Sequence, residues 1–265
     1  MRKQSSFKNF TLMIAAIGSL ATFTSSAESL LQFVSFNTTD KITIRGIFAK
    51  PKSISGSLQS DKLPAVIFLH QGGSSKSEWT SLPLFQQVVN NQMIALAIDI
   101  RGHGESSGTA DFPTIFDDPN QSPRDLAAAI KYLIDSNLVD SDRIAIVGAS
   151  IGANLAAMAA GNNDYSIKTA VAMSAKTSAI YNLSGVDKSV LKFKTLYLIA
   201  AELEQEGKRA LWAKEIYDIT KGDRELEVVK GSHRHGVSIF KDAPHLQTRI
   251  LQWLKDTLYT RTSTK

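Results

Sequence analysis

Residues 148–152 read GASIG, and the interpretation of the whole sequence starts from this stretch. It joins an apolar run at 143–147, typical of a buried strand, to a helix rich in small residues predicted at 150–160. Between a strand and a helix, a G-x-S-x-G pattern predicts a sharp turn that lifts the Ser150 hydroxyl above the edge of a sheet. The start of the helix favours negative charge that develops there. A glycine-flanked turn without chemistry is the alternative interpretation.

Outward from this turn, short apolar runs alternate with amphipathic segments. Continuous apolar runs are typical of strands buried on both faces of a parallel sheet, and two earlier runs around a turn at 37–40 predict an antiparallel hairpin. The alternation predicts an α/β fold with a mostly parallel eight-stranded sheet, an antiparallel N-terminal hairpin and helices on both faces. The predicted strands are 30–36, 42–49, 65–69, 93–99, 143–147, 168–173, 195–200 and 225–230, and the predicted helices are 78–91, 124–136, 150–160, 206–220 and 244–258.

The N-terminal segment has the composition of an export signal. Basic residues stand at positions 2, 3 and 8, an apolar stretch covers 11–23, and Ser25 and Ala27 are small residues at a cleavage site. The apolar stretch is shorter than the roughly 20 residues that span a bilayer, although an uncleaved anchor is the alternative. We therefore expect a signal peptide at 1–27, a single domain at 28–265, and an exported protein, periplasmic or extracellular, without a membrane anchor after cleavage.

Composition excludes several function classes. The 265-residue chain has no cysteine, so it has no disulfide scaffold, thiolate metal site, iron–sulfur cluster or cysteine nucleophile. Its net charge is +5, but residues 1–27 carry three basic and no acidic side chains, so 28–265 carry only +2. No helix has a basic stripe with interleaved aromatics, so we expect no nucleic-acid partner.

A candidate general base follows the last predicted strand. His235 lies in a loop at the edge where the strands end, and a neutral imidazole there can take and return the proton of Ser150. His233 is the competing candidate. The two histidines also have the character of metal ligands, but no further ligand cluster accompanies them. We expect neither a metal nor another cofactor.

The loop after the predicted strand 195–200 supplies candidate acids. It reads AELEQE over 201–206, and a carboxylate there would hold the histidine tautomer and stabilise the imidazolium. The chain order Ser, acid, His favours this loop. Glu202, Glu204 and Glu206 are all candidates, and an acidic start to the following helix is the alternative interpretation.

A glycine-rich turn, HQGG at 70–73, follows the predicted strand 65–69. It lacks the Gly-Lys-Ser/Thr sequence of a phosphate loop. Its backbone N–H groups are suited to an oxyanion, with Ile151 as the second donor. Gly72 is the favoured donor in this turn and Gln71 the alternative. In the later RGHGES turn at 101–106, we expect His103 to order the loop rather than act as a base.

Taken together, these motifs resemble the α/β-hydrolase superfamily, and most closely its compact dienelactone-hydrolase-like or esterase-like members. The resemblance covers about residues 40–258 and rests on the order of HQGG at 70–73, DIRGHGES at 99–106, GASIG at 148–152 and HG at 235–236. It implies that Ser150 is the nucleophile, His235 the base and, by loop register, Glu204 the acid, with Glu202 as runner-up. The family usually has Asp at the acid position. Dienelactone hydrolases use a cysteine nucleophile, which this chain lacks.

The function expected from these features is that of a serine hydrolase that cleaves small or medium carboxylic esters through an acyl-enzyme. Only 21 residues separate the predicted strands 168–173 and 195–200, too few for a large lid domain. Phe112, Phe116 and Trp79 are the candidates for an apolar wall around the substrate. A peptidase and a non-catalytic binding protein of the same fold are the alternatives, and the sequence does not indicate an oligomeric state.

Overall fold

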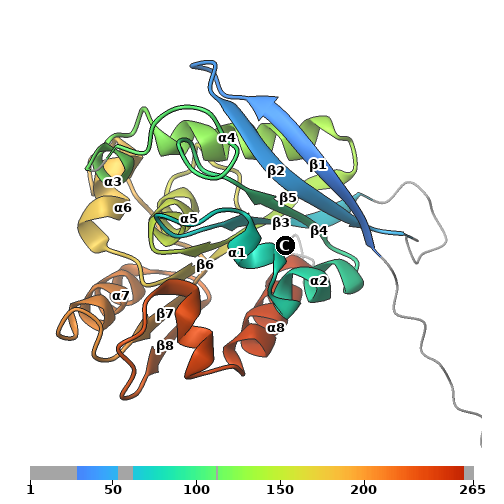
Figure 1. Cartoon of the computed structure of the whole chain (residues 1–265). Coiled ribbons are helices and arrows are strands. Elements are labelled where there is room, and N and C mark those ends of the chain that lie inside the picture. Colours follow the sequence, from blue (N-terminus) through green and yellow to red (C-terminus); the bar gives the residue numbers. More distant parts are fainter. Residues whose placement is uncertain (1–28, 53–61, 112, 260–265) are drawn as a thin grey trace, which may run out of the picture.

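The computed structural model describes residues 29–52, 62–111 and 113–259, so the predicted signal peptide and Phe112 lie outside the described residues. A single eight-stranded sheet forms its centre (Figure 1). The strands are β1 (Ser29–Asn37), β2 (Thr43–Pro51), β3 (Leu63–Leu69), β4 (Ile94–Ile98), β5 (Val139–Ala149), β6 (Thr169–Met173), β7 (Leu196–Ala201) and β8 (Arg224–Val229).

The sheet has the order β1-β2-β4-β3-β5-β6-β7-β8. β1 and β2 form an antiparallel hairpin, β2 pairs antiparallel with β4, and every other neighbouring pair is parallel. The predicted sheet, including its N-terminal hairpin, is confirmed.

Helices connect the strands, and their bounds depart from the predicted ones at two places. The helix expected at 78–91 is split because Pro83 disfavours helical geometry at Leu82, which has φ −90° and ψ 144°. The helix expected at 206–220 begins only at Lys208, since Gln205, Glu206 and Gly207 all have positive φ. The helices are α1 (Ser77–Thr80), α2 (Pro83–Asn90), α3 (Thr114–Asp117), α4 (Ser122–Asp135), α5 (Ile151–Gly161), α6 (Thr177–Ser184), α7 (Lys208–Ile219), the 3₁₀ helix η1 (Gly236–Lys241) and α8 (Leu246–Tyr259).

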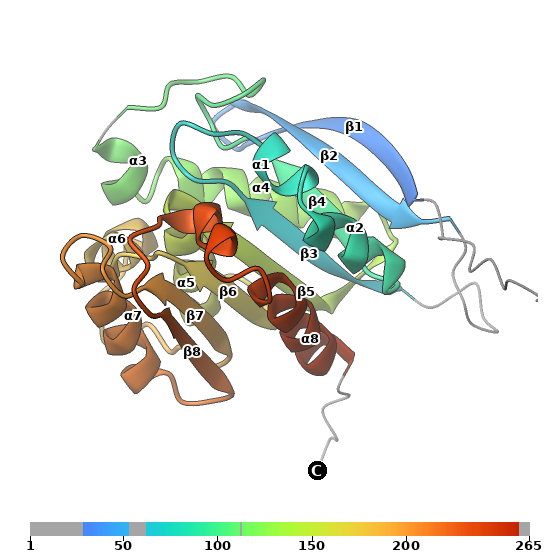
Figure 2. The same cartoon turned by 60° about the horizontal axis from the view of Figure 1, so that its bottom comes forward.

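Two apolar layers cover the sheet, one on each face. Side chains alternate across a strand, so that Ile67 of β3 belongs to the layer that contains α4, α5, α6 and α7, while its neighbour Phe68 belongs to the layer that contains α1, α2 and α8. Figure 2 brings α2 and α8 forward on the second face. Within the described ranges, no helix is long and apolar enough to cross a membrane.

The carboxyl ends of the six parallel strands meet at one edge of the sheet. Ser150 follows β5, Glu204 follows β7 and His235 follows β8. Segments far apart in the sequence therefore meet where α/β sheets bind their ligands.

Candidate active site

Ser150 occupies a strained turn between β5 and α5. Its backbone has φ 53° and ψ −108°, a conformation that costs a non-glycine residue about 1–3 kcal/mol. The flanking glycines are required by space: a Cβ on Gly148 would lie 2.1 Å from the Gly152 carbonyl oxygen, and one on Gly152 would lie 2.2 Å from that of Leu69. The Ser150 N–H donates to the Met173 carbonyl at 2.9 Å. The turn is thus held against β3 on one side and β6 on the other.

Two backbone N–H groups near this turn are suited to an oxyanion. Ile151 is the first residue of α5, so no carbonyl of that helix can accept its N–H. Across from it, the N–H of Gln71 donates to Glu78 Oε2 at 2.9 Å. Because this bond already uses the Gln71 N–H, the Gly72 N–H is favoured as the second oxyanion donor beside that of Ile151.

The buried His70 orients the peptide that carries this N–H. His70 Nε2 accepts the Ile100 N–H at 3.0 Å, so Nδ1 carries the proton and donates to the Gln71 carbonyl at 2.7 Å. Burial lowers the pKa of His70 to about 4, which keeps the ring neutral. Because a trans peptide is planar, the bond to the Gln71 carbonyl directs the Gly72 N–H to the opposite side.

Of the three candidate glutamates, the structure brings Glu204 to the histidine. The Nδ1 atom of His235 lies 2.5 Å from Oε1 of Glu204, whose side chain is only 5% exposed. Glu202 instead accepts from Lys230 Nζ at 2.7 Å, and the side chain of Glu206 is 89% exposed. Because a carboxylate only accepts, Nδ1 donates to Glu204 and Nε2 remains an acceptor.

Two residues that the sequence did not single out hold the acid. Ser174 Oγ donates to Glu204 Oε2 at 2.7 Å and accepts the Gly236 N–H at 3.0 Å. The buried Arg209 has its Nε 3.1 Å from Glu204 Oε1, and one of its terminal nitrogens donates to the Ser174 carbonyl at 2.8 Å. Ser174 directly follows β6 at the same edge of the sheet, and this position, rather than any motif, is the signal that could have found it.

The loop that carries His235 packs against the serine turn through Gly236. Gly236 has φ 55°, and a Cβ on it would lie 2.1 Å from Gln71 Oε1 and 3.4 Å from Ala149 Cβ. The positive φ favours glycine here, while the Gln71 side chain could move to make room for a Cβ. In the described part of the chain, no hydrogen bond joins the Ser150 hydroxyl to His235. Such a catalytic bond is often long in an enzyme without substrate and shortens when substrate binds.

The loops after β3 and β4 are fastened to each other through Asp99. Its fully buried carboxylate accepts the Lys76 backbone N–H and its Nζ, both at 2.6 Å, and the Glu105 N–H at 2.9 Å. Lys76 Nζ also reaches Glu105 at 2.5 Å. The loop that carries the Gly72 N–H is therefore fixed to the scaffold.

Comparison with protein families decides the assignment of this fold. Residues 64–217, more than half of the chain, match the model of the alpha/beta hydrolase fold. The chain belongs to the alpha/beta hydrolase fold family. None of the curated proteins matches it.

Solved structures show the same fold at low sequence identity. An esterase of Pyrococcus furiosus has a TM-score of 0.65 at 21% identity, over 86% of this chain and 93% of that one. An acetyl xylan esterase of Paenibacillus sp. R4 has a TM-score of 0.62 at 19% identity, over 85% and 88%. An acylaminoacyl peptidase of Pyrococcus horikoshii has a TM-score of 0.65 at 16% identity, over 89% of this chain and 43% of that one.

In this alpha/beta hydrolase, one of the aromatic residues expected around a substrate, Trp79, lies in the core. Trp79 is fully buried, donates from Nε1 to the Leu69 carbonyl at 2.9 Å, and packs on Phe68 and Phe240. The expectation that it forms a substrate wall is wrong, because the core covers it completely. Phe116 is half-buried in α3 and packs against the other apolar layer.

The other histidines of the hydrolase have no base-like arrangement. His103 is buried, its Nδ1 lies 3.1 Å from the Arg101 carbonyl, and its ring lies 5.0 Å from that of His70, as expected of a residue that orders its loop. His233 is exposed. Among the residues that the structure describes, no cluster of His, Asp and Glu is suited to a metal ion.

Proposed function

We propose that this alpha/beta hydrolase cleaves small or medium carboxylic esters, with Ser150 as the nucleophile, His235 as the base and Glu204 as the acid of the triad. The observation that carries the proposal is the 2.5 Å contact between His235 and Glu204 at the sheet edge where Ser150 occupies its strained turn. The fold shared with two esterases supports an ester as the bond that is cleaved.

The mechanism is a two-step acyl transfer. Ser150 Oγ attacks the ester carbonyl while His235 Nε2 takes the hydroxyl proton, and the N–H groups of Gly72 and Ile151 hold the oxyanion. His235 then gives the proton to the leaving alkoxide, and Glu204 stabilises the imidazolium until it does. Water attacks the acyl-enzyme in the same way and releases the acid.

The expected substrate size follows from the connection between β6 and β7. In the described chain this connection contains the eight-residue α6 in place of a separate lid domain. A short connection supports an open site that accepts small or medium acyl groups rather than long chains enclosed in a tunnel.

A fluorophosphonate probe and a series of p-nitrophenyl esters from acetate to decanoate test the proposal. We expect wild-type protein to be labelled, and Ser150→Ala to lose labelling and at least about 10⁴-fold in kcat. Ser141→Ala, at an exposed position near the other end of β5, is the control and should behave as wild type. Full activity in Ser150→Ala would refute the nucleophile. No labelling of wild type would favour a binding protein, and faster cleavage of peptide p-nitroanilides would favour a peptidase.

We also propose export with cleavage after Ala27, on the basis of the basic and apolar composition of residues 1–27. Expression of the full chain in a bacterium with fractionation and N-terminal sequencing tests this. A mature protein that begins at Glu28 outside the cytoplasm is the expected result, and an uncleaved cytoplasmic chain would contradict it.

A further inference from the structure

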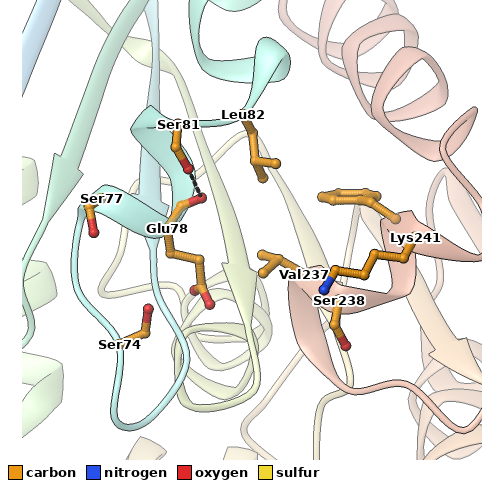
Figure 3. A pocket seen from close by; sticks show the side chains of 9 residues that line it. Ser74, Ser77, Glu78, Ser81, Leu82, Val237, Ser238 and Lys241 are labelled. Carbon is orange, nitrogen blue, oxygen red and sulfur yellow. Dashed lines mark hydrogen bonds between the residues drawn. The ribbon is translucent and has the colours of Figure 1, made fainter.

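A cavity of about 470 Å³ lies beside the candidate triad, between α1 and η1 (Figure 3). One wall comes from the loop after β3 and from α1, and includes Ser74, Ser77 and Glu78. The opposite wall comes from η1 and includes Ser238 and Lys241. Its volume falls in the range of about 300–1,000 Å³ that is typical of ligand sites.

Both walls are bonded to the catalytic loops. Glu78 Oε2 accepts the N–H of Gln71, the residue before the candidate oxyanion donor Gly72, at 2.9 Å. On the other side, Ser238 Oγ accepts the His235 N–H at 3.1 Å and donates to the His235 carbonyl at 2.7 Å. The cavity therefore opens between the loop that would hold the oxyanion and the loop that would hold the base.

The charges of the cavity favour a neutral ligand. Glu78 and Lys241 contribute one carboxylate and one ammonium from opposite walls, and within the described residues neither forms an ion pair. The two charges cancel, so an anionic ligand is attracted by Lys241 but repelled by Glu78, and a cationic ligand the reverse. A neutral ligand meets neither repulsion. Burial raises the pKa of Glu78, and the hydrogen bonds from Gln71 and Ser74 and the nearby His235 act against this rise.

The chemistry of the lining is divided between polar and apolar sides. Glu78 and the serine hydroxyls supply hydrogen-bond acceptors and donors, whereas Leu82, Val237 and Phe240 supply apolar lining. Figure 3 shows the side chains of Leu82 and Val237 beside that of Glu78. A ligand with hydroxyl groups along one edge and C–H groups on its face matches both sides. Polyols and sugars have this distribution.

The position of the cavity indicates which half of an ester substrate it would bind. The histidine that protonates the leaving oxygen must lie beside the leaving group. Val237 and Ser238 come shortly after this histidine in the chain, separated from it by Gly236, and line the cavity. We propose that the cavity binds the alcohol half of the substrate and that this half is a neutral, hydroxyl-rich group, a polyol or a sugar. The inference rests on the proposed ester hydrolysis.

Two esters that differ only in hydroxyl groups test the inference. 1-Butyrylglycerol and propyl butyrate share the acyl group and the three-carbon leaving chain. We measure kcat/KM for each by acid release in a pH-stat, because this constant reports acylation, the step in which the alcohol leaves. Dividing each value by the hydroxide-catalysed rate of the same ester removes differences in intrinsic reactivity. We expect wild type to prefer the glycerol ester at least about tenfold, as one hydrogen bond to a charged group permits.

Variants then connect the preference to the cavity. Glu78→Gln keeps an oxygen that can accept the Gln71 N–H but removes the charge, and we expect it to lower the preference about tenfold. Ser77→Phe, at an exposed position of the lining, places a ring at the entrance and should lower it without touching the Gln71 contact. The matched control is Glu225→Gln, since Glu225 lies on β8, outside the lining, and pairs with Arg249 of α8. It should keep the wild-type preference.

The outcomes separate this inference from the proposed function. If wild type cleaves both esters equally well, or if Glu78→Gln and Ser77→Phe leave the preference unchanged, the cavity does not bind the alcohol half, while ester hydrolysis still stands. If wild type cleaves neither ester and a fluorophosphonate does not label Ser150, the proposed function fails and the inference fails with it.

Discussion

Replacing Glu204 with glutamine removes one negative charge next to His235 and changes the shape of the side chain little. In the wild type, Oε1 lies 2.5 Å from Nδ1 of the imidazole. Opposite unit charges about 4 Å apart attract by about 4 kcal/mol at an effective dielectric constant near 20. The imidazolium forms only on the way to the transition state, so this attraction lowers the barrier. Each increase of about 1.4 kcal/mol in the barrier slows the reaction tenfold, so losing about 4 kcal/mol should lower kcat/KM about 10³-fold.

The same change should also destabilise the fold, because it leaves Arg209 without its carboxylate. Arg209 is 7% exposed, and removing one partner of a buried ion pair costs about 3–5 kcal/mol. For a chain of this size, this corresponds to a Tm lower by roughly 10 °C. The double variant Glu204→Gln/Arg209→Met removes both charges, so it should regain much of the stability while remaining inactive.

Hydrolysis of p-nitrophenyl butyrate at 25 °C, together with thermal melting by circular dichroism, measures both effects. Glu202→Gln is the matched control in the same loop, where Glu202 pairs with Lys230. A folded Glu204→Gln variant whose kcat/KM falls less than about tenfold would contradict this role of the charge. A Glu202→Gln variant whose kcat/KM falls more than about tenfold would also contradict it. Recovery of activity in the double variant would show that the loss came from instability rather than from missing charge.

Three further changes probe the surroundings of the site. Ser174→Ala removes the hydroxyl that joins Glu204 to the His235 loop. In steady-state kinetics we expect kcat to fall about tenfold with KM unchanged. An unchanged kcat would contradict a role of Ser174 in positioning Glu204 and His235. The folded-state pKa of His70 is about 4, below its ordinary 6.5, so the unfolded chain binds this proton more tightly. Urea unfolding should therefore show a stability that is complete above pH 6.5 and declines as the pH falls toward 4, less steeply in His70→Gln; equal slopes would exclude His70 as the cause. Gly152→Ala places a Cβ 2.2 Å from a β3 carbonyl oxygen and should lower the free energy of unfolding by about 3 kcal/mol or more, as thermal melts will measure. Gly73→Ala is the comparison: only a φ of 73° opposes its side chain, so it should lower the free energy of unfolding by about 1–2 kcal/mol.

Much of the sheet was predictable because its inner strands are mostly apolar and its turns carry distinctive residues. The GASIG stretch required a strand before it and a helix after it, and its glycines lie where a Cβ would come within 2.1 or 2.2 Å of a backbone oxygen. The same logic placed His235 at the correct edge, since a loop after a parallel strand can lie nowhere else. In these cases local sequence and tertiary position impose the same requirement.

What the sequence left open depends on side-chain direction. Glu202, Glu204 and Glu206 lie in one loop, and only the folded structure shows that the carboxylate of Glu204 is the one that reaches His235. A large apolar side chain such as Trp79 serves a core and a substrate wall equally well until its burial is known. No local pattern announces Ser174, because its partners lie 30 and 62 residues away along the chain.

These long separations have a consequence for how the protein acquires activity during folding. The hydrogen bonds that hold the acid and the His235 loop join residues 30 to 62 positions apart, and they come from β6, β7 and β8 at one end of the sheet. Contacts of this kind form late, since the entropy of closing the chain between them must first be overcome. Recovered turnover would then report the last stage of refolding, after helical structure has already returned.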